Sequence, residues 1–356
     1  MLRPDPFIDP MKVIYLILLK KLKNIVIVFL KKWVTILIKT NIKLFGGRFT
    51  MFDKEKYGKI LVPLVTPFKE GDQSVDYDAA VSIAEKLIDD NKADSIILSG
   101  TTGEFFTMSF EERVKLFKVI KDAVGNKIPL MAGVGCASTI ETMALAKKAE
   151  EIGFEIMMVV SPYYSKPTQK ELYNHFKKVA ESVNIPMMLY NIPIFTGVNI
   201  NPETVAQLSK IENIIAIKEE AELNPKQMTE FINTTPDNFI IYCGDDTMIL
   251  EAFAQGGAKR IGGIISGASH IIGVQLRNMI NMFLNGKVEE AAKIQQKYFP
   301  LFRIMGQNGR TNPASLLKEA MKMIGYNAGI PRLPLTPGTE EEISKIKKVM
   351  EELRII

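Results

Sequence analysis

The chain has 356 residues, of which 47% are hydrophobic and 24% are charged, a composition typical of a globular protein that can bury a large core. Its net charge of +5 arises in residues 1–50, which hold ten of the 45 basic and two of the 40 acidic residues; the remaining 35 basic and 38 acidic residues give −3, so the charge does not point to a nucleic-acid partner. Two cysteines and two histidines are too few for a disulfide framework or a zinc-ligand cluster, so we expect a cytoplasmic protein without a metal site.

Residues 11–45 alternate short apolar runs with lysines. None of these runs approaches the roughly 20 apolar residues of a membrane-spanning helix, and no signal-peptide cleavage site is evident. A basic amphipathic segment on a membrane surface is an alternative interpretation. Because ordered patterning begins abruptly after Met51, we predict that residues 1–50 form a basic extension outside the fold, and that protein starting at Met51 is fully active.

Eight short apolar runs rich in Ile, Val and Met follow in the rest of the chain. They span residues 60–68, 95–100, 130–135, 155–161, 187–191, 214–219, 239–244 and 260–266. Near-continuous apolar content is typical of strands buried on both faces, as in parallel sheets. Helix-like stretches separate the runs, among them residues 76–89, a segment capped by Ser109 and one that begins at Pro202. This alternation predicts an α/β fold, the (β/α)8 TIM barrel.

From about residue 271 the alternation stops, and helical patterns follow at residues 274–284, 288–302, 313–324 and 340–353. No low-complexity linker precedes them. We therefore predict a barrel over residues 51–285 and a C-terminal helical subdomain over residues 286–356.

Lys218 is the most informative residue at the strand ends, where the active sites of such barrels lie. It follows four apolar residues of the sixth run and should be largely desolvated. Desolvation lowers the pKa of a lysine, and a neutral amine is the nucleophile that imine formation needs. Alternatively, Lys218 extends to solvent or pairs with Glu219 or Glu220.

Three other strand ends carry hydroxyl groups that suit proton transfer or anion binding. Tyr190 ends the neighbouring run, where its phenol can relay protons to an imine, although a tyrosine packed at the barrel rim would look the same. Thr101 and Thr102 lie between two glycines, in a turn that can aim N–H groups and hydroxyls at a carboxylate or that serves only as a turn. Tyr164 is either a second proton relay or a hydrophobic rim residue.

Together, these strand ends resemble the dihydrodipicolinate synthase / N-acetylneuraminate lyase family of class I pyruvate-dependent aldolases. The resemblance extends from about residue 57 to the C-terminus. Its motifs, in chain order, are Gly100-Thr101-Thr102-Gly103-Glu104, Ser161-Pro162-Tyr163-Tyr164, Leu189-Tyr190-Asn191-Ile192-Pro193, Ile217-Lys218-Glu219 and Gly244-Asp245-Asp246, followed by Ala268-Ser269-His270 and Asn312-Pro313.

The resemblance implies a lyase that forms a covalent Schiff base with its substrate and needs no cofactor. By this resemblance, Lys218 forms the imine with pyruvate, and Tyr190 is the central acid and base. Thr101 and Thr102 bind the pyruvate carboxylate and join the proton relay.

The resemblance also implies an assembly. Tyr164 looks like the tyrosine that reaches into the proton relay of a neighbouring subunit, which would make a dimer the smallest active unit. Family members are commonly homotetramers, so we expect a homotetramer built from dimers. Gly244 and Ile265 look like the backbone positions near bound pyruvate.

Two positions depart from the synthase pattern. The synthases carry an arginine that grips the carboxylate of their aldehyde substrate, and Phe195 stands at that position. Phe105 and Phe106 follow Glu104, where the synthases carry a small hydroxyl residue. The loss of a bidentate clamp predicts a neutral aldehyde partner, because an aromatic ring cannot pair with a carboxylate.

Four hypotheses follow from these residues. The first is an aldolase that joins or releases pyruvate and the aldehyde of a 2-keto-3-deoxy sugar acid. The second is the lysine-pathway synthase of the family, which joins pyruvate to aspartate semialdehyde, with Arg310 as the candidate that restores a cation from elsewhere in the chain. The third is a phosphate- or flavin-binding barrel, suggested by Gly256-Gly257 and Gly262-Gly263. The fourth is an inactive regulatory relative, which the complete set of relay residues argues against.

Overall fold

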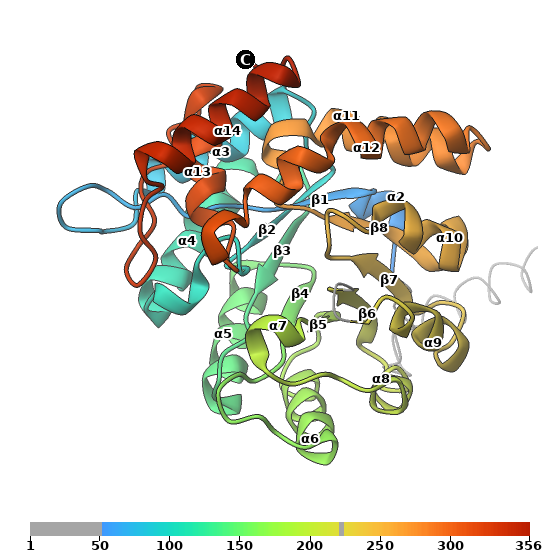
Figure 1. The fold of residues 1–356 in the computed structure, drawn as a ribbon. Coiled ribbons are helices and arrows are strands. Elements are labelled where there is room, and N and C mark those ends of the chain that lie inside the picture. The colour runs from blue at the N-terminus through green and yellow to red at the C-terminus, as the bar shows by residue number, and fades with distance from the viewer. Residues whose placement is uncertain (1–51, 221–223) are drawn as a thin grey trace, which may run out of the picture. The chain divides into compact units, whose positions relative to one another are not determined.

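A closed barrel of eight parallel strands forms the centre of the fold (Figure 1). The computed structural model describes residues 52–220 and 224–356, so the predicted extension over residues 1–50 lies outside the described residues. The strands are β1 (Ile60–Pro63), β2 (Ser95–Leu98), β3 (Leu130–Gly133), β4 (Met157–Val160), β5 (Met187–Asn191), β6 (Ile214–Glu219), β7 (Ile240–Cys243) and β8 (Ile261–Ile265). They pair in chain order and β8 closes the ring on β1, which confirms the predicted (β/α)8 barrel.

Alternation along each strand sorts its side chains between the barrel interior and the layer beneath the helices. On β6, Ala216 belongs to the interior cluster and Ile217 to the cluster under the helices. On β5, Met188 and Tyr190 likewise face the interior. Lys218, two residues after Ala216, therefore points into the barrel.

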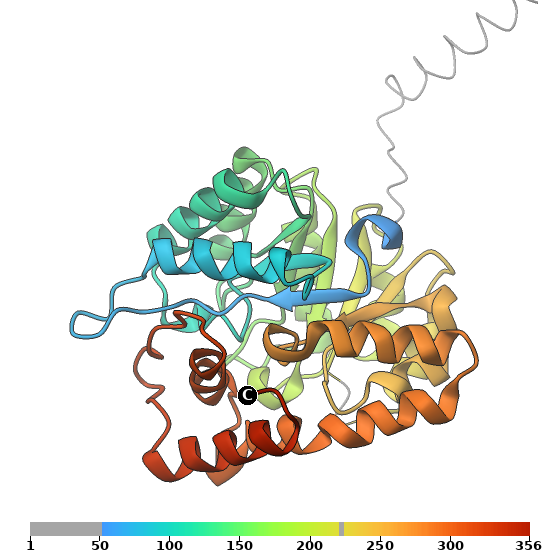
Figure 2. The ribbon, with the colours of Figure 1, turned by 90° about the horizontal axis from the view of Figure 1, so that it is seen from above.

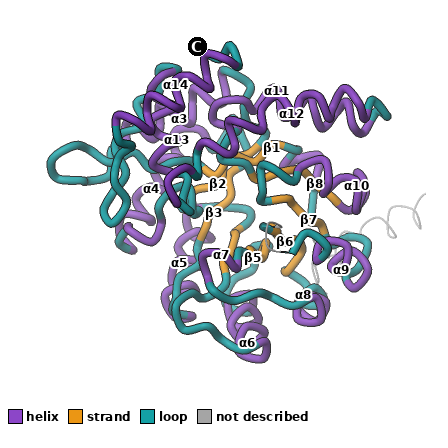
Figure 3. The backbone as a smooth tube through the Cα atoms, in the orientation of Figure 1, coloured by secondary structure: helices purple, strands orange, loops and turns teal. Residues whose placement is uncertain are grey.

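Helices surround the barrel, as the purple segments around the orange strands show in Figure 3. They are α2 (Lys54–Tyr57), α3 (Tyr77–Asp89), α4 (Phe110–Val124), α5 (Thr139–Ile152), α6 (Gln169–Ala180), α7 (Pro193–Thr196), α8 (Pro202–Leu208), α9 (Gln227–Thr234), α10 (Ile249–Arg260) and α11 (Ser269–Leu284), with a short 3-10 turn η1 (Phe105–Thr107). The predicted starts are confirmed: Ser109 and Glu112 form a capping box at α4, and Pro202 occupies the first turn of α8.

The C-terminal helices gather along one side of the barrel (Figure 2). They are α12 (Val288–Ile304), α13 (Ala314–Met323) and α14 (Glu340–Glu352), with a 3-10 turn η2 (Gln307–Gly309) between the first two. Helix α11 begins at Ser269, five residues before the predicted residue 274, and its first turn is separated from the rest by a kink at Ile272, where the backbone is non-helical. The division into a barrel and a helical subdomain at residues 285 and 286 stays a prediction.

Aromatic side chains fill one end of the barrel. The ring of Phe52 lies 4.9 Å from that of Tyr57 and 5.5 Å from that of Tyr242, and the Tyr242 hydroxyl donates a hydrogen bond to the carbonyl of Gly58, just before β1. The open end is therefore the one at the carboxyl ends of the strands. None of the described helices is long and apolar enough to cross a membrane.

Candidate active site

Lys218 and Tyr190 lie side by side at the carboxyl ends of β6 and β5. The strand register pairs the two residues directly, and Lys218 Nζ donates a hydrogen bond of 3.0 Å to the Tyr190 hydroxyl. Lys218 is only 6% exposed, and the interior residues Met188 and Ala216 precede the pair on the same strands. The two residues that the strand ends predicted as nucleophile and proton relay are thus in direct contact.

Lys218 is surrounded by groups that favour its charged form. Burial by itself lowers the pKa of Lys218, but Tyr190, Glu220 and Asp246 outweigh burial and raise the pKa above the ordinary value of a lysine. Glu220 Oε2 lies 3.8 Å from Lys218 Nζ. The structure thus contains the alternative contact, a pair with the neighbouring Glu220, and this contact opposes the predicted neutral amine.

The loop after β2 brings Thr101 and Thr102 to the same place. The Thr101 hydroxyl lies 3.4 Å from the Tyr190 hydroxyl, which extends the chain of polar contacts from Lys218 into the loop. Backbone bonds from Gly103 N to Gly100 O and from Glu104 N to Thr101 O hold the turn. The hydroxyls of the loop and the lysine amine can therefore contact one small substrate.

The two glycines do not supply the unusual backbone of this loop. The left-handed conformations fall on the residues that flank it, Ser99 (φ 57°) and Glu104 (φ 54°). Gly103 is required for close approach instead, because a Cβ there would lie 2.9 Å from the carbonyl oxygen of Leu64. Positive φ at non-glycine residues is uncommon and needs support from surrounding structure.

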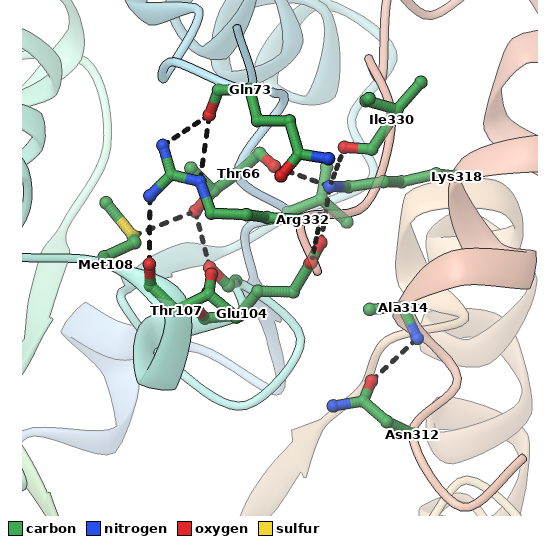
Figure 4. A network of polar contacts seen from close by, with 12 residues as sticks. Thr66, Gln73, Glu104, Thr107, Met108, Asn312, Ala314, Lys318, Ile330 and Arg332 are labelled. Atoms are coloured by element: carbon green, nitrogen blue, oxygen red, sulfur yellow. Dashed lines mark hydrogen bonds and ion pairs between the residues drawn. The ribbon is translucent and has the colours of Figure 1, made fainter. Parts of the chain in front are cut away.

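A buried ion pair supplies that support on one side of the loop (Figure 4). Glu104 and Lys318 of α13 are both fully buried, and the Lys318 ammonium contacts Glu104 Oε1. Lys318 also donates hydrogen bonds of 2.7 Å to the Thr66 carbonyl and 2.8 Å to the Ile330 carbonyl. The second carboxylate oxygen of Glu104 accepts a 2.9 Å bond from the backbone N–H of Arg332. The C-terminal helices thereby anchor the loop that carries Thr101 and Thr102.

A cavity of about 620 Å³ opens at the carboxyl ends of the strands. Every residue that the sequence assigned to substrate binding lines it, together with the predicted nucleophile and relay: Thr101, Thr102, Gly244, Ile265, Phe195, Lys218 and Tyr190. A Cβ at Gly244 would lie 2.6 Å from Cε of Lys218, so a larger residue at position 244 would displace the lysine.

Tyr164 does not reach this cavity in its own chain. Its side chain is 96% exposed and its backbone is left-handed, with φ 70°. A second, apolar cavity of about 410 Å³ adjoins the first, shares Thr101 and Phe195 with it, and includes Phe105 and Tyr163 in its lining. The predicted contribution of Tyr164 to a neighbouring subunit stays a prediction.

Two basic residues line the main cavity above the lysine. Arg310 is already paired: its Nε and Nη2 donate bonds of 2.9 and 3.0 Å to the two carboxylate oxygens of Glu342, and Nη1 donates to the Thr336 carbonyl. Arg303, near the C-terminus of α12, is exposed, and its guanidinium has no hydrogen-bond or ion-pair partner among residues 52–220 and 224–356. Of the two arginines that line this cavity, Arg303 is therefore the one whose charge can pair with a substrate.

No role in the site was predicted from the sequence for its acidic residues, although Asp245 and Asp246 belong to a motif and Glu220 was an alternative partner of Lys218. Asp245, Asp246 and Glu220 line the cavity with Lys218. Burial raises the pKa of Asp246 to about 6, and its Oδ1 has no hydrogen-bond partner in the described part of the chain. The Gly-Asp-Asp motif after β7 and the glutamate two residues after Lys218 were the signals that could have revealed them.

Three of the four glycines that suggested a phosphate- or flavin-binding barrel are explained by packing. A Cβ at Gly262 would collide with the ring of Tyr242, and one at Gly263 with the backbone of Lys59. A Cβ at Gly256 would lie 2.8 Å from Ile232. Packing therefore accounts for Gly256, Gly262 and Gly263, whereas Gly257 has positive φ (55°) and no atom within 4 Å of a Cβ.

Comparison with known proteins identifies the family of the chain. Residues 56–353 match the model of the dihydrodipicolinate synthetase family. The 4-hydroxy-tetrahydrodipicolinate synthase of Desulforudis audaxviator is 42% identical over 84% of this chain and 99% of its own. Solved dihydrodipicolinate synthases from Bacillus anthracis (39% identity, TM-score 0.77, 83% of this chain and 98% of that chain) and from Cyanidioschyzon merolae with lysine bound (36% identity, TM-score 0.79, 84% and 99%) share the fold.

Proposed function

The chain belongs to the dihydrodipicolinate synthetase family, and we propose that it is a 4-hydroxy-tetrahydrodipicolinate synthase that condenses pyruvate with aspartate semialdehyde. The observation that carries this proposal is the 42% identity with a synthase of that name over 99% of its length. It favours the second of the sequence hypotheses over the first, the sugar-acid aldolase. Both are pyruvate lyases of one family and differ in the aldehyde that they accept.

In the proposed reaction, the amine of Lys218 attacks the carbonyl carbon of pyruvate and an imine forms with loss of water. The Tyr190 hydroxyl, 3.0 Å from Lys218 Nζ, and the Thr101 hydroxyl, 3.4 Å further on, form a path along which protons can move to and from the reacting atoms. Thr101 and Thr102 hold the pyruvate carboxylate. The substrate becomes the electron sink, so the proposal includes no cofactor.

The active assembly in this proposal is a dimer or a homotetramer built from two dimers. Tyr164 is a large aromatic residue held almost fully exposed in a strained conformation. The apolar cavity beside Thr101 is open to an aromatic side chain from a second copy of the chain. Size measurement of the purified protein, with wild type compared with Tyr164→Ala, tests this part of the proposal.

Phe195 supports a second candidate function, the sugar-acid aldolase. It is 38% exposed, lines the main cavity and offers no charge to a carboxylate. Arg303 supports the synthase instead, because it brings an uncommitted guanidinium to the same cavity and can pair with the carboxylate of aspartate semialdehyde. The two candidates therefore make opposite predictions about charge in the aldehyde.

The test compares kcat/KM for aspartate semialdehyde and for glyceraldehyde, each with pyruvate. The synthase proposal expects wild type to prefer aspartate semialdehyde by tenfold or more. Arg303→Met should lower that preference by about tenfold, the usual scale of one charge-assisted bond, whereas Lys297→Met, on the same helix and exposed, should not. A wild-type preference for glyceraldehyde would establish the aldolase instead. Borohydride trapping of pyruvate on the peptide with Lys218, lost in Lys218→Ala, tests the Schiff base that both candidates share.

A further inference from the structure

Glu220 is placed by the same alternation that places the nucleophile. It follows Lys218 by two residues, so both side chains face the interior at the end of β6, whereas Glu219 between them faces the helices. Glu220 Oε2 lies 3.8 Å from Lys218 Nζ, and the side chain is mostly buried. The same oxygen would lie 2.8 Å from a Cβ at Gly244, which puts the carboxylate against the wall where the lysine turns into the cavity.

The resting site creates a need for a proton acceptor. Lys218 forms an ion pair with Glu220, with 3.8 Å between Nζ and Oε2, and a lysine in an ion pair is an ammonium, which has no lone pair with which to attack a carbonyl. Tyr190 is the nearest polar neighbour, but its oxygen already accepts the hydrogen bond from Lys218, and burial, reinforced by Glu220, raises the pKa of its phenol. A neutral phenol does not remove a proton from an ammonium, so the first step needs another base.

The other acidic groups near the lysine differ from Glu220 in forming no ion pair with Lys218, although Asp245 Oδ2 and Asp246 Oδ1 have no hydrogen-bond partner in the described part of the chain. Glu219 Oε2 accepts a 2.9 Å bond from the Asn191 side chain on the outer side of the barrel wall. Asp245 Oδ1 accepts bonds from the backbone and the hydroxyl of Thr247. Asp246 Oδ2 accepts a bond from the backbone of Ala268. Among the described carboxylates, only Glu220 forms an ion pair with Lys218.

We propose that Glu220 is a catalytic acid–base residue of the pyruvate half-reaction. Its carboxylate accepts a proton from the Lys218 ammonium, and the freed amine forms a bond to the carbonyl carbon of pyruvate. The carbonyl oxygen becomes the hydroxyl of the carbinolamine as a second proton moves from the attacking nitrogen through Tyr190. Protonated Glu220 then returns its proton to that hydroxyl, which leaves as water as the C–N double bond forms. The inference rests on the proposed Schiff base, but not on the identity of the aldehyde.

The experiment measures the rate of imine formation in single-turnover mixtures of full-length enzyme and pyruvate. Samples are quenched with borohydride at increasing times, and mass spectrometry quantifies the modified peptide between pH 6 and pH 9. The variants are Glu220→Gln, which keeps the size of the side chain, Glu220→Asp, which keeps the acid, and the control Glu230→Gln, which removes a charge from the exposed face of α9. Circular dichroism verifies that each variant is folded.

The sign of the change separates catalysis from electrostatics. If Glu220 only stabilises the ammonium, its loss lowers the pKa of Lys218 and makes imine formation faster at low pH, with Tyr190 and Asp246 as the remaining neighbours. If Glu220 moves the proton, Glu220→Gln slows imine formation by about 100-fold near pH 7, the lower end of general acid–base catalysis, and Glu220→Asp recovers part of the rate. A rate for Glu220→Gln equal to or above wild type overturns the inference. Failure of wild type to trap pyruvate on Lys218 overturns both the inference and the proposed function.

Discussion

Replacement of Glu104 by Gln tests the buried ion pair that anchors the threonine loop. Glu104 and Lys318 are fully buried, and both carboxylate oxygens of Glu104 are used, one by Lys318 and one by the backbone N–H of Arg332. Glutamine has the same shape but a single acceptor oxygen, so it can serve one partner and not the other. The variant leaves the Lys318 ammonium buried without a counter-charge.

The expected loss of stability follows from the contacts that remain. Removing one partner of a buried ion pair typically costs about 3–5 kcal/mol. Lys318 keeps its bonds to the carbonyls of Thr66 and Ile330, and burial already lowers its pKa to about 8, so it can lose its proton more readily than an ordinary lysine. Both facts favour the lower end of this range, so we expect the free energy of unfolding to fall by about 3 kcal/mol. For the folded unit over residues 50–356, that corresponds to a decrease in Tm of about 5 °C.

Thermal unfolding followed by circular dichroism measures this shift, with Glu111→Gln at an exposed position of α4 as the matched control. Because Glu104 holds the loop that carries Thr101 and Thr102, the KM for pyruvate should rise several-fold in Glu104→Gln as well. A second replacement, Lys318→Met, should restore part of the lost stability, since it removes the uncompensated charge. A decrease in Tm of less than 1 °C, or no coupling between the two replacements, would refute this account of the loop.

Three further predictions concern the site and its surroundings. Tyr190→Phe should lower kcat by about 100-fold with the fold intact; a change of less than threefold in steady-state assays would make Tyr190 only structural. Burial raises the pKa of Glu219 from 4.5 to about 8, so the folded chain binds more protons than the unfolded chain between these values, and stability falls as pH rises through that window; urea midpoints at pH 5 and pH 8 should differ less in Glu219→Gln than in wild type. By the family resemblance, lysine-inhibited synthases place a polar pocket at the dimer interface, and Phe105 stands at one of its positions, where the buried Arg113 guanidinium lies 5.2 Å from the ring centroid; millimolar L-lysine should therefore not inhibit turnover, and a clear inhibition curve would contradict this.

Much of the barrel was predictable because its strands are buried on both faces and follow one another in pairing order. The predicted strand boundaries were less accurate. The first apolar run was taken to residue 68, whereas β1 ends at Pro63, since the buried loop that follows is as apolar as the strand. The apolar content of a run predicts which residues are buried. It does not predict where a strand ends, because strand pairing also requires a neighbouring strand at hydrogen-bonding distance.

The catalytic pair was predictable for a related reason, since the carboxyl ends of consecutive strands meet at one end of a barrel. Lys218 and Tyr190 end their runs in the sequence and are paired in register in the structure. The Glu104–Lys318 ion pair was not predictable, because its partners are 214 residues apart and belong to different parts of the fold. No periodic pattern marks a lysine of α13 as the partner of a glutamate in the loop after β2.

The ion pair between Lys218 and Glu220 shows what the prediction of a neutral lysine from strand position alone leaves out. The argument counted the burial of one side chain, but the pKa of a buried lysine depends on the balance between burial and the charges that share its cavity. On β6 that balance depends on which face of the strand each residue occupies. Glu219 and Glu220 are identical residues next to each other, yet Glu219 faces the helices and is bound by Asn191, whereas Glu220 faces the cavity and pairs with the lysine. Once Lys218 is assigned to the interior, period-two alternation assigns Glu220 to it as well, so a carboxylate beside the nucleophile was already implied by the order of the residues Lys218-Glu219-Glu220.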